Sequence, residues 1–209
     1  MPGKIISFEG IEGTGKSTQI QALKAFLGIK SVDSITIREP GNTYIGEQIR
    51  YLLQHDPEAY NMCAETELLL FEASRAQLVR ELILPTIQKN TWVICDRFFD
   101  SSTAYQGAAR QLPEEIVHRL NRFAIGTCVP DLTILLDIDV DLALERLRQR
   151  RVQKDRIERE SVEFFNRVRE KYLQLTEEEP ARFLTIDATL PVEAITEKIC
   201  THVQKRFLL

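Results

Sequence analysis

The chain has 209 residues, of which 44% are hydrophobic and 28% charged, and its formal net charge is −4 at pH 7. This length and composition predict one globular domain over residues 1–209, and the acidic balance disfavours a nucleic-acid binder, since such proteins carry a basic excess. No apolar run is long enough to span a membrane and the N-terminus has no signal-peptide core, so we expect a cytoplasmic protein without a membrane partner.

Short apolar runs alternate with helical patterns along the chain. The first half predicts a strand over 5–8, a helix over 17–27 that stops at Gly28, a strand over 35–37, a helix around 45–53 and a long helix over 64–79 whose continuation Pro85 interrupts. The second half predicts a strand over 92–95, a helix over 113–125, a strand over 132–136, helices around 142–147 and over 161–175, a strand over 183–186 and a closing helix over 191–207.

The strands have four or five apolar residues without polar alternation, which is typical of a parallel sheet covered on both faces. Their alternation with helices indicates the same arrangement. We therefore predict an α/β fold with three layers, in which a five-stranded parallel sheet is flanked by helices. In such sheets, ligands bind at the carboxyl ends of the strands.

The segment between the first predicted strand and the first predicted helix fits the P-loop pattern GxxxxGK[ST]. Its glycines let backbone N–H groups curl around phosphate oxygens, and the helix N-terminus adds a partial positive charge. Lys16 would reach the β- and γ-phosphates, and the Ser17 hydroxyl would bind Mg²⁺. A chance glycine-rich turn is the alternative, and the complete match in this context disfavours it. The predicted nucleotide site consists of Gly10, Ile11, Glu12, Gly13, Thr14, Gly15, Lys16, Ser17 and Thr18.

Other classes of protein lack support in the sequence. A regulatory GTPase would need NKxD and DxxG patterns, and a transporter ATPase would need SGGQ, but none of these patterns occurs. The four cysteines form no CxxC pair and the three histidines are far apart, so we expect no zinc site. A small enzyme that uses ATP is the class that remains.

Six segments, in this order along the chain, resemble those of thymidylate kinases. They are Phe8-Glu9-Gly10-Ile11-Glu12-Gly13, Arg38-Glu39-Pro40-Gly41, Leu70-Phe71-Glu72-Ala73-Ser74-Arg75-Ala76-Gln77, Asp96-Arg97-Phe98, Ser101-Ser102-Thr103-Ala104-Tyr105-Gln106-Gly107 and Asp155-Arg156-Ile157-Glu158. The resemblance implies the P-loop fold of nucleoside monophosphate kinases, phosphorylation of dTMP to dTDP with ATP and Mg²⁺ for dTTP biosynthesis, and a homodimer. Two features depart from the family: Asn42 stands where a second glycine is usual, and the lid is about one residue longer than in bacterial relatives.

A dTMP site must hold a monophosphate, and arginines are the residues that can do so. Arg97 is a candidate because a guanidinium grips two oxygens at once, and the resemblance implies Arg38 as a second phosphate ligand. The alternative for each is a surface ion pair.

The same site must also stack and read a pyrimidine. Phe71 and Arg75 lie four residues apart on one helical face, so a ring could lie on the base while the guanidinium reaches O4 at its edge. Spacing alone leaves Phe71 as an ordinary core residue, and only the resemblance favours the stacking role.

The sugar and the base have further candidate ligands, all implied by the resemblance. Glu12 would accept a hydrogen bond from the 3′-hydroxyl, and Tyr105 would pack where a 2′-hydroxyl projects. Ser101 and Gln106 would lie near the base. The alternative for Tyr105 is an ordinary core tyrosine.

An acidic residue follows each of two predicted strands. Asp96 follows the strand 92–95 and Asp137 follows the strand 132–136, so either carboxylate could hold the water shell of Mg²⁺ or orient the attacking phosphate. The Asp96-Arg97 pair and the resemblance favour Asp96. We interpret Asp137 as a helix cap or an ion pair.

Basic residues crowd between 146 and 159 in an otherwise acidic chain. A solvated helix face and a nucleic-acid arm are two readings of such a run, and the second is disfavoured by the net charge. The third is a mobile lid at about 146–159 that brings arginines to the transferring phosphoryl group. The bacterial type of thymidylate kinase carries its catalytic arginine there, and Glu12 fits that type. We expect Arg148 or Arg150 to contact the phosphates.

The predicted catalytic residues are thus Lys16, Asp96, Arg97, Arg148 and Arg150, with ATP as phosphoryl donor and Mg²⁺ held by Ser17 and Asp96. Two alternatives are left open by the residues themselves. One is another nucleoside monophosphate or deoxynucleoside kinase, and the other is a regulatory nucleotide-binding module without catalysis.

Overall fold

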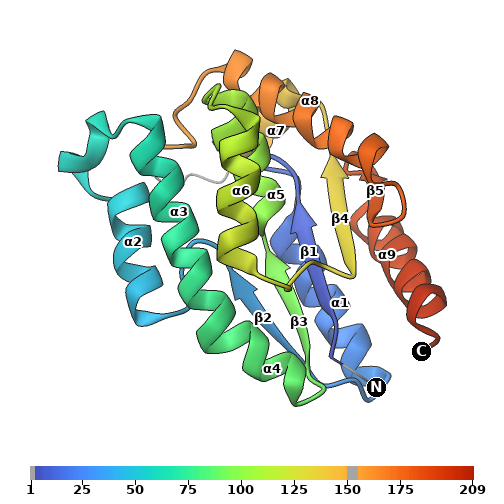
Figure 1. The fold of residues 1–209 in the computed structure, drawn as a ribbon. Coiled ribbons are helices and arrows are strands. Elements are labelled where there is room, and N and C mark those ends of the chain that lie inside the picture. The colour runs from blue at the N-terminus through green and yellow to red at the C-terminus, as the bar shows by residue number, and fades with distance from the viewer. Residues whose placement is uncertain (1–2, 150–154) are drawn as a thin grey trace.

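Five parallel strands form the centre of the molecule (Figure 1). The computed structural model describes residues 3–149 and 155–209. The strand order is β2-β3-β1-β4-β5, with bounds β1 (Ile5–Glu9), β2 (Ser34–Arg38), β3 (Trp92–Asp96), β4 (Leu132–Asp137) and β5 (Phe183–Asp187). The predicted α/β fold with five parallel strands is confirmed. Each strand extends by at least one polar residue beyond its apolar run.

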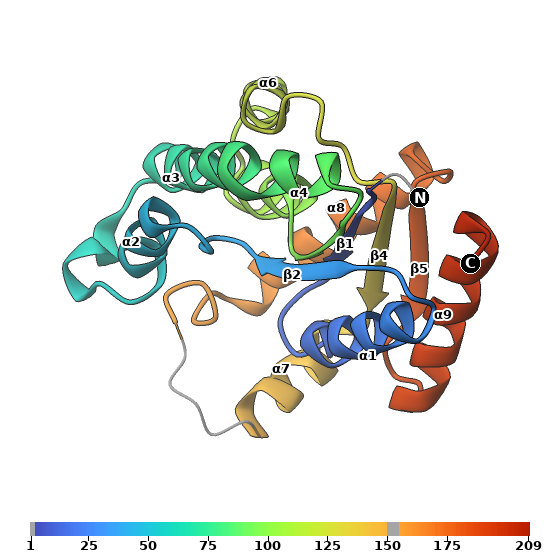
Figure 2. The same cartoon turned by 90° about the horizontal axis from the view of Figure 1, so that it is seen from below.

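Helices cover both faces of the sheet (Figure 2). α1 (Lys16–Ile29) and α9 (Val192–Phe207) pack on one face. The other face carries α3 (Ala64–Leu78), α4 (Leu84–Gln88), α5 (Phe99–Ser102) and α8 (Val162–Glu178), with α6 (Glu114–Ile125) outside them. α2 (Tyr44–Gln54) packs against α3, and α7 (Val140–Gln149) follows β4. None of the helices in the two described ranges is long and apolar enough to cross a bilayer.

The three central strands lie in the core because both of their faces are covered. All five residues of β1 are buried, and Phe8, Ile94 and Ile134 are fully enclosed on three neighbouring strands. Burial of each such side chain contributes roughly 1.5–3 kcal/mol of hydrophobic stabilisation. This apolar packing fixes the strand ends, which carry the polar residues of the site.

Two predicted helix ends differ from the structure. α1 continues through Gly28 to Ile29, and the chain turns at Ser31, whose φ is 57°. Pro85 does not break the helical path either. A π-helical segment, η2 (Val79–Ile83), joins α3 to α4, and Pro85 falls in the first turn of α4. A first-turn proline needs no hydrogen-bonded N–H, and the wider π turn changes the register of the helix before the ring.

A second π-helical segment was not predicted. η3 (Thr103–Ala109) continues α5 and carries Tyr105 and Gln106. A short 3₁₀ helix, η1 (Pro57–Asn61), also joins α2 to α3. π-helical turns are frequent at functional sites, because the extra residue redirects side chains. Here α5 and η3 together follow the end of β3.

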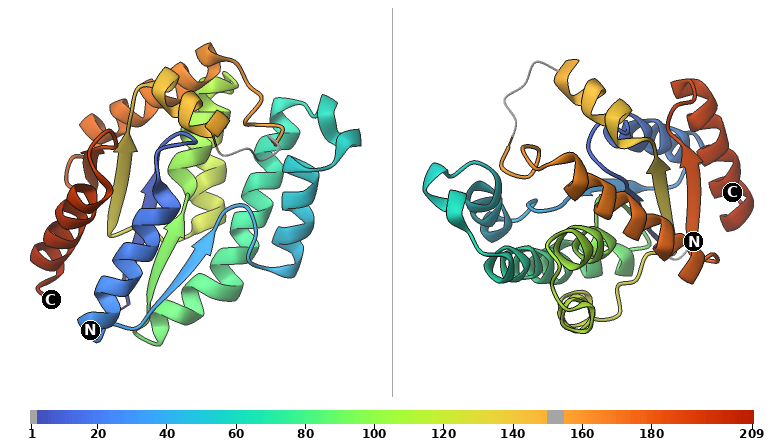
Figure 3. Two further views of the ribbon diagram at one scale, coloured as in Figure 1. Left: turned by 180° about the vertical axis from the view of Figure 1, so that it is seen from behind. Right: turned by 90° about the horizontal axis from the view of Figure 1, so that it is seen from above.

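The carboxyl end of every strand is a charged residue. The last residues are Glu9, Arg38, Asp96, Asp137 and Asp187. Because the strands are parallel, these residues come together at one edge of the sheet, which is viewed from above in Figure 3. The P-loop, the start of α5 and the loop after β5 meet at the same edge.

Candidate active site

A cavity of about 240 Å³ opens at the carboxyl edge of the sheet. The P-loop forms one side of it, and residues of α2, α3, η3 and the chain at 155–158 form the other. The predicted residues that line it are Glu12, Gly13, Gly15, Lys16, Ser17, Arg38, Phe71, Asp96, Arg97, Ser101, Tyr105 and Gln106. Residues that are far apart in sequence, and that were predicted to bind two different substrates, thus share one cavity.

The P-loop has the geometry of a phosphate cradle. Gly15 is the N-cap of α1 with φ 90°, and no side chain caps the helix, so the N–H groups of its first turn face the cavity. A Cβ added at Gly10 would lie 2.5 Å from the Leu136 carbonyl oxygen, so only glycine fits against β4. The strand-to-helix context predicted for this motif is confirmed.

Lys16 spans the P-loop. Its Nζ donates to the carbonyl oxygens of Gly10 and Ile11, both at 2.9 Å. Burial, and then the charge of Arg97, lower the pKa of this ammonium to about 8, against the attraction of Glu12. The ammonium is therefore desolvated in advance of any contact with a phosphate.

Ser17 and Asp96 meet at the mouth of the cavity. Ser17 Oγ donates to Asp96 Oδ2 at 3.3 Å. Mg²⁺ prefers oxygen ligands and commonly binds through one or two protein groups together with waters and phosphates. These two oxygens, beside the phosphate cradle, fit such an ion. In the described ranges no group of three or more His, Cys, Asp or Glu residues could hold a metal by itself.

Arg97 lies in the part of the cavity that Glu12 and Tyr105 line. Its Nη2 donates to Glu12 Oε1 at 2.7 Å and to the Tyr105 hydroxyl at 3.1 Å, and Tyr105 donates to Glu12 Oε2 at 2.8 Å. The backbone of Arg97 has φ 69°, an uncommon value that turns the chain out of β3. These contacts join three of the predicted site residues, Glu12, Arg97 and Tyr105, in one network.

A buried carboxylate supports this network from beneath. Glu9 accepts hydrogen bonds from Phe98 N at 2.7 Å, from Ser101 Oγ at 2.6 Å and from the Tyr172 hydroxyl at 2.7 Å. Burial, and then the charge of Asp100, raise the pKa of Glu9 to about 7. Glu9 belongs to a segment that carried the family resemblance, but its role was not predicted, because its hydrogen-bond partners lie far away in the chain.

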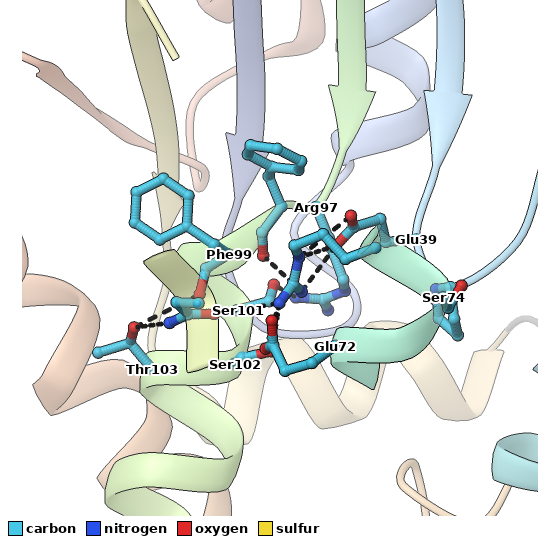
Figure 4. Close-up of polar contacts among 12 residues, drawn as sticks. Glu39, Glu72, Ser74, Arg97, Phe99, Ser101, Ser102 and Thr103 are labelled. Atoms are coloured by element: carbon cyan, nitrogen blue, oxygen red, sulfur yellow. Dashed lines mark hydrogen bonds and ion pairs between the residues drawn. The ribbon is translucent and has the colours of Figure 1, made fainter. Parts of the chain in front are cut away.

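Arg75 is buried beside the cavity and does not line it. Its guanidinium is 1% exposed, and Glu39 and Glu72 point toward it together with Ser102 (Figure 4). Arg75 Nη2 donates to Glu39 Oε2 at 2.7 Å, and Nη1 donates to Ser102 Oγ at 3.0 Å and to Asn121 Oδ1 at 3.1 Å. To reach a base edge, the guanidinium would exchange one of these acceptors. The reading of thymine O4 by Arg75 stays a prediction.

Arg38 lines the cavity but is also half exposed and paired. Its guanidinium donates to both carboxylate oxygens of Glu47, at 2.9 and 3.1 Å. Asn42, which replaces a family glycine, has φ 65° and accepts a hydrogen bond from Arg38 N. Asparagine tolerates this left-handed backbone better than most residues do. Arg50 of α2, which was not predicted, also lines the cavity and donates to the Pro40 carbonyl oxygen at 3.0 Å.

The remaining predicted residues lie elsewhere. Asp137 accepts from Arg169 Nε at 2.7 Å and Nη2 at 3.0 Å, so its interpretation as an ion pair is confirmed. Arg148 lies on the exposed surface of α7, 3.5 Å from Glu145, and does not line the cavity. Arg150 lies outside the described residues.

Several residues that line the cavity were missed. Gln54, Asp155, Ile157 and Glu158 contribute to its wall. The last three belong to a segment quoted for the family resemblance, which was the one available signal. Gln54 ends an amphipathic helix, and nothing in its spacing distinguishes it from a surface residue.

Comparison with known proteins decides the family. The family model described as thymidylate kinase matches residues 8–199. The chain belongs to the thymidylate kinase family. A thymidylate kinase of Kosmotoga olearia is 49% identical over 98% of this chain and 95% of the relative. Thymidylate kinases of Thermosipho melanesiensis and Teredinibacter turnerae are 45% and 44% identical, over 93% and 95% of this chain and 94% and 96% of the relatives. The resemblance stated from the motifs is therefore confirmed across nearly the whole chain.

Proposed function

We propose that this cavity holds both substrates of the reaction, ATP on the P-loop side and dTMP on the side of Phe71, Arg97 and Tyr105. As a member of the thymidylate kinase family, the chain is a transferase that phosphorylates dTMP to dTDP with ATP, in dTTP biosynthesis. The observation that carries the proposal is the continuity of the cavity from Lys16 and Ser17 to Phe71 and Gln106. Neither another nucleoside monophosphate kinase nor an inactive module is favoured.

The transfer itself needs positioning and charge stabilisation more than covalent chemistry. The dTMP phosphate oxygen attacks the γ-phosphorus of ATP, and ADP leaves. Lys16 stabilises the charge of the ATP phosphates, and Arg97 holds the phosphate of dTMP in line. When Arg38 leaves Glu47, it binds the phosphate of dTMP together with Arg97. An arginine of the 146–159 segment, Arg148 or Arg150, stabilises the remaining negative charge of the transferring phosphoryl group.

Ser17 and Asp96 are the residues that would hold Mg²⁺. When bound, the ion would act as a Lewis acid and offset the negative charge of the phosphates. The 3.3 Å between Ser17 Oγ and Asp96 Oδ2 supports this assignment, because both oxygens face the same space beside the P-loop.

The nucleoside of dTMP has its own ligands in this proposal. Phe71 stacks on the base, and Gln106 and Ser101 lie near its edge, with Arg75 behind them. Tyr105 is 4% exposed and its hydroxyl is held by Glu12 and Arg97, so its ring forms a fixed wall. A fixed wall rejects an added 2′-hydroxyl better than a mobile one, because relaxation would break these hydrogen bonds.

We also propose that the protein works in the cytoplasm as a homodimer. Leu69 on α3 and Ile116 and Phe123 on α6 are 54%, 51% and 79% exposed, and these two helices pack side by side. Exposed apolar side chains on neighbouring helices support the proposal of an interaction surface. Phe123→Glu should shift the sedimentation coefficient from dimer to monomer, and Ile29→Glu, at an 81% exposed site at the end of α1, should not. A monomeric wild type would contradict the dimer.

Separate binding titrations test the two-sided cavity. Arg97→Met should weaken dTMP binding and leave ATP binding within about twofold, whereas Lys16→Met should do the reverse. Isothermal calorimetry with each nucleotide alone measures both affinities. If either variant loses both ligands equally while its unfolding temperature is unchanged, the two substrates do not occupy the halves assigned here.

A further inference from the structure

A buried carboxylate on α3 joins three segments around the cavity. Glu67 is 1% exposed and lies one helical turn before Phe71. Its Oε1 accepts from Gln106 Nε2 at 2.8 Å and from Arg110 Nε at 3.1 Å. Its Oε2 accepts from Arg110 Nη2 at 3.1 Å and from Arg156 Nη2 at 2.6 Å. One side chain thus binds groups from η3, from the residue after η3 and from the segment before α8.

Two of these partners lead directly to the cavity. Gln106 lines it, next to Tyr105 in the chain. Arg156 stands between Asp155 and Ile157, which both line it, and Arg156 Nε also donates to the Leu53 carbonyl oxygen near the end of α2 at 3.0 Å. Figure 3 shows the chain before α8, in orange, returning toward α2. Glu67 does not line the cavity itself, so any influence on a ligand passes through these neighbours.

The charge on Glu67 is what holds the group together. Burial alone would raise its pKa, but the hydrogen bonds and the attraction of Arg110, together with Gln106 and Arg156, lower the pKa below the ordinary value. The carboxylate is therefore ionised at neutral pH. Arg110 has a second acidic partner, Glu160, at 2.7 Å. Loss of the Glu67 charge would therefore mainly weaken the hydrogen bonds of Arg156, whose side chain is 11% exposed, and of Gln106.

We infer that Glu67 is a positioning residue for the monophosphate end of the cavity. It holds Gln106 on one side and the segment 155–160 on the other. These two parts of the cavity wall are thereby kept at a fixed distance from Phe71. The inference rests on the proposed dTMP site and assigns to that site a residue that touches no substrate. The ATP side of the cavity receives no support from Glu67.

Steady-state kinetics of Glu67→Gln test this role. The variant keeps one acceptor and the side-chain volume but removes the charge that binds the arginines. We expect the KM for dTMP to rise about tenfold, which corresponds to about 1.4 kcal/mol, and the KM for ATP to stay within about twofold. Glu114→Gln, which removes the contact with Lys171 away from the cavity, is the control and should leave both KM values unchanged.

Arg156→Met tests the same contact from its other side. This variant leaves the Glu67 contacts with Arg110 and Gln106 in place, so it remains informative if Glu67→Gln folds poorly. It should also raise the KM for dTMP, and the two changes together should have less than the sum of their separate effects, because both remove the contact between Glu67 and Arg156. Hydrogen exchange of residues 155–160 in the ligand-free protein should be faster in each variant.

The exchange measurement separates this inference from the proposed function. Wild-type turnover with dTMP tests the function, whereas exchange without nucleotide tests whether Glu67 holds the segment. Unchanged exchange in Arg156→Met overturns the inference, whatever the turnover. So does a Glu67→Gln protein with a lower unfolding temperature but a KM for dTMP within twofold of wild type, because Glu67 would then serve folding alone.

Discussion

Ser17 Oγ donates a hydrogen bond to Asp96 Oδ2 across 3.3 Å, and this contact joins the end of the P-loop to the end of β3. The two residues are 79 positions apart in the chain. The pairing of β1 with β3 brings them together, because Phe8 lies in register with Asp96. The contact makes a specific role for Asp96 testable.

Asp96→Asn should lower kcat by roughly 10²-fold and raise the Mg²⁺ concentration needed for half-maximal activity, because an amide is a weaker ligand for a hard cation. Initial rates at saturating ATP and dTMP over a Mg²⁺ series measure both effects. Asp137→Asn is the matched control at the end of β4, where the carboxylate pairs with Arg169. If the Asp137 variant shows the Mg²⁺ effect and the Asp96 variant does not, the metal site is assigned to the wrong strand.

Phe71→Ala should raise the KM for dTMP by roughly 5–150-fold, the range expected for the loss of 1–3 kcal/mol of stacking on a base. The KM for ATP should change little, since Phe71 lies on the other side of the cavity. Gln77→Ala, on the same helix and bonded to Glu81, is the control. Equal changes in both KM values would point to a general distortion of α3.

Arg150→Ala should lower kcat by roughly 10³-fold, as the loss of an arginine that stabilises a transferring phosphoryl group does. Arg148→Ala, at an exposed position of α7, is the competing assignment. Single-turnover rates with both substrates prebound report the chemical step and exclude an effect on product release. An Arg150 variant within a factor of two of wild type would rule out its catalytic role and transfer the assignment to Arg148.

ATP affinity should fall as pH rises above about 8, because the Lys16 ammonium, whose pKa is lowered to about 8 by burial, then becomes neutral. The decline approaches about tenfold per pH unit once the amine is largely deprotonated. Equilibrium titration with Mg·ATP between pH 7 and 9.5 measures it. In Lys16→Arg the decline should disappear, since a guanidinium stays protonated in this range. A flat wild-type profile would mean that the ammonium is better solvated than its burial implies.

Stability of the ligand-free protein should fall as pH rises from about 4.5 to about 7, through the contribution of Glu9. Its pKa is raised on folding, so the folded state favours the protonated carboxyl, and that contribution is complete at low pH and lost as the group ionises. Glu9→Gln should flatten this part of the curve relative to wild type, measured as the free energy of unfolding in urea. The exposed Glu193→Gln should not. A steeper curve for Glu9→Gln would reverse the sign assigned here.

The fold was largely predictable because apolar strands in a parallel sheet are continuous runs bounded by charged residues. The P-loop was predictable because its glycines and Lys16 stand close together in the sequence and are required by a local backbone geometry. The π-helical segments were not, because a π turn arises from packing and leaves no period of its own in the sequence. Pro85 therefore suggested a break where the helix only changes register.

The cavity was predictable only in part. Phe71, Arg97 and Tyr105 belong to recognisable family motifs, and in the structure all three line the same cavity. Glu9 and Glu67 depend on contacts with residues far away in the chain, and no local sequence pattern indicates such contacts. For Arg75 the local pattern was clear and the distant contacts were not. Its spacing from Phe71 predicted a group that reads the base, but the structure surrounds its guanidinium with buried hydrogen-bond acceptors.

The most direct test of the proposed dTMP kinase activity measures the release of ADP from Mg·ATP with different phosphate acceptors. The acceptors are dTMP, dUMP, UMP, CMP, dCMP, AMP and GMP. We expect a strong preference for dTMP in kcat/KM, because the fixed Tyr105 ring would exclude the 2′-hydroxyl of the ribonucleotides. A preference for another monophosphate would contradict the base and sugar assignments. No turnover with any of them, despite measurable ATP binding, would contradict the kinase activity itself.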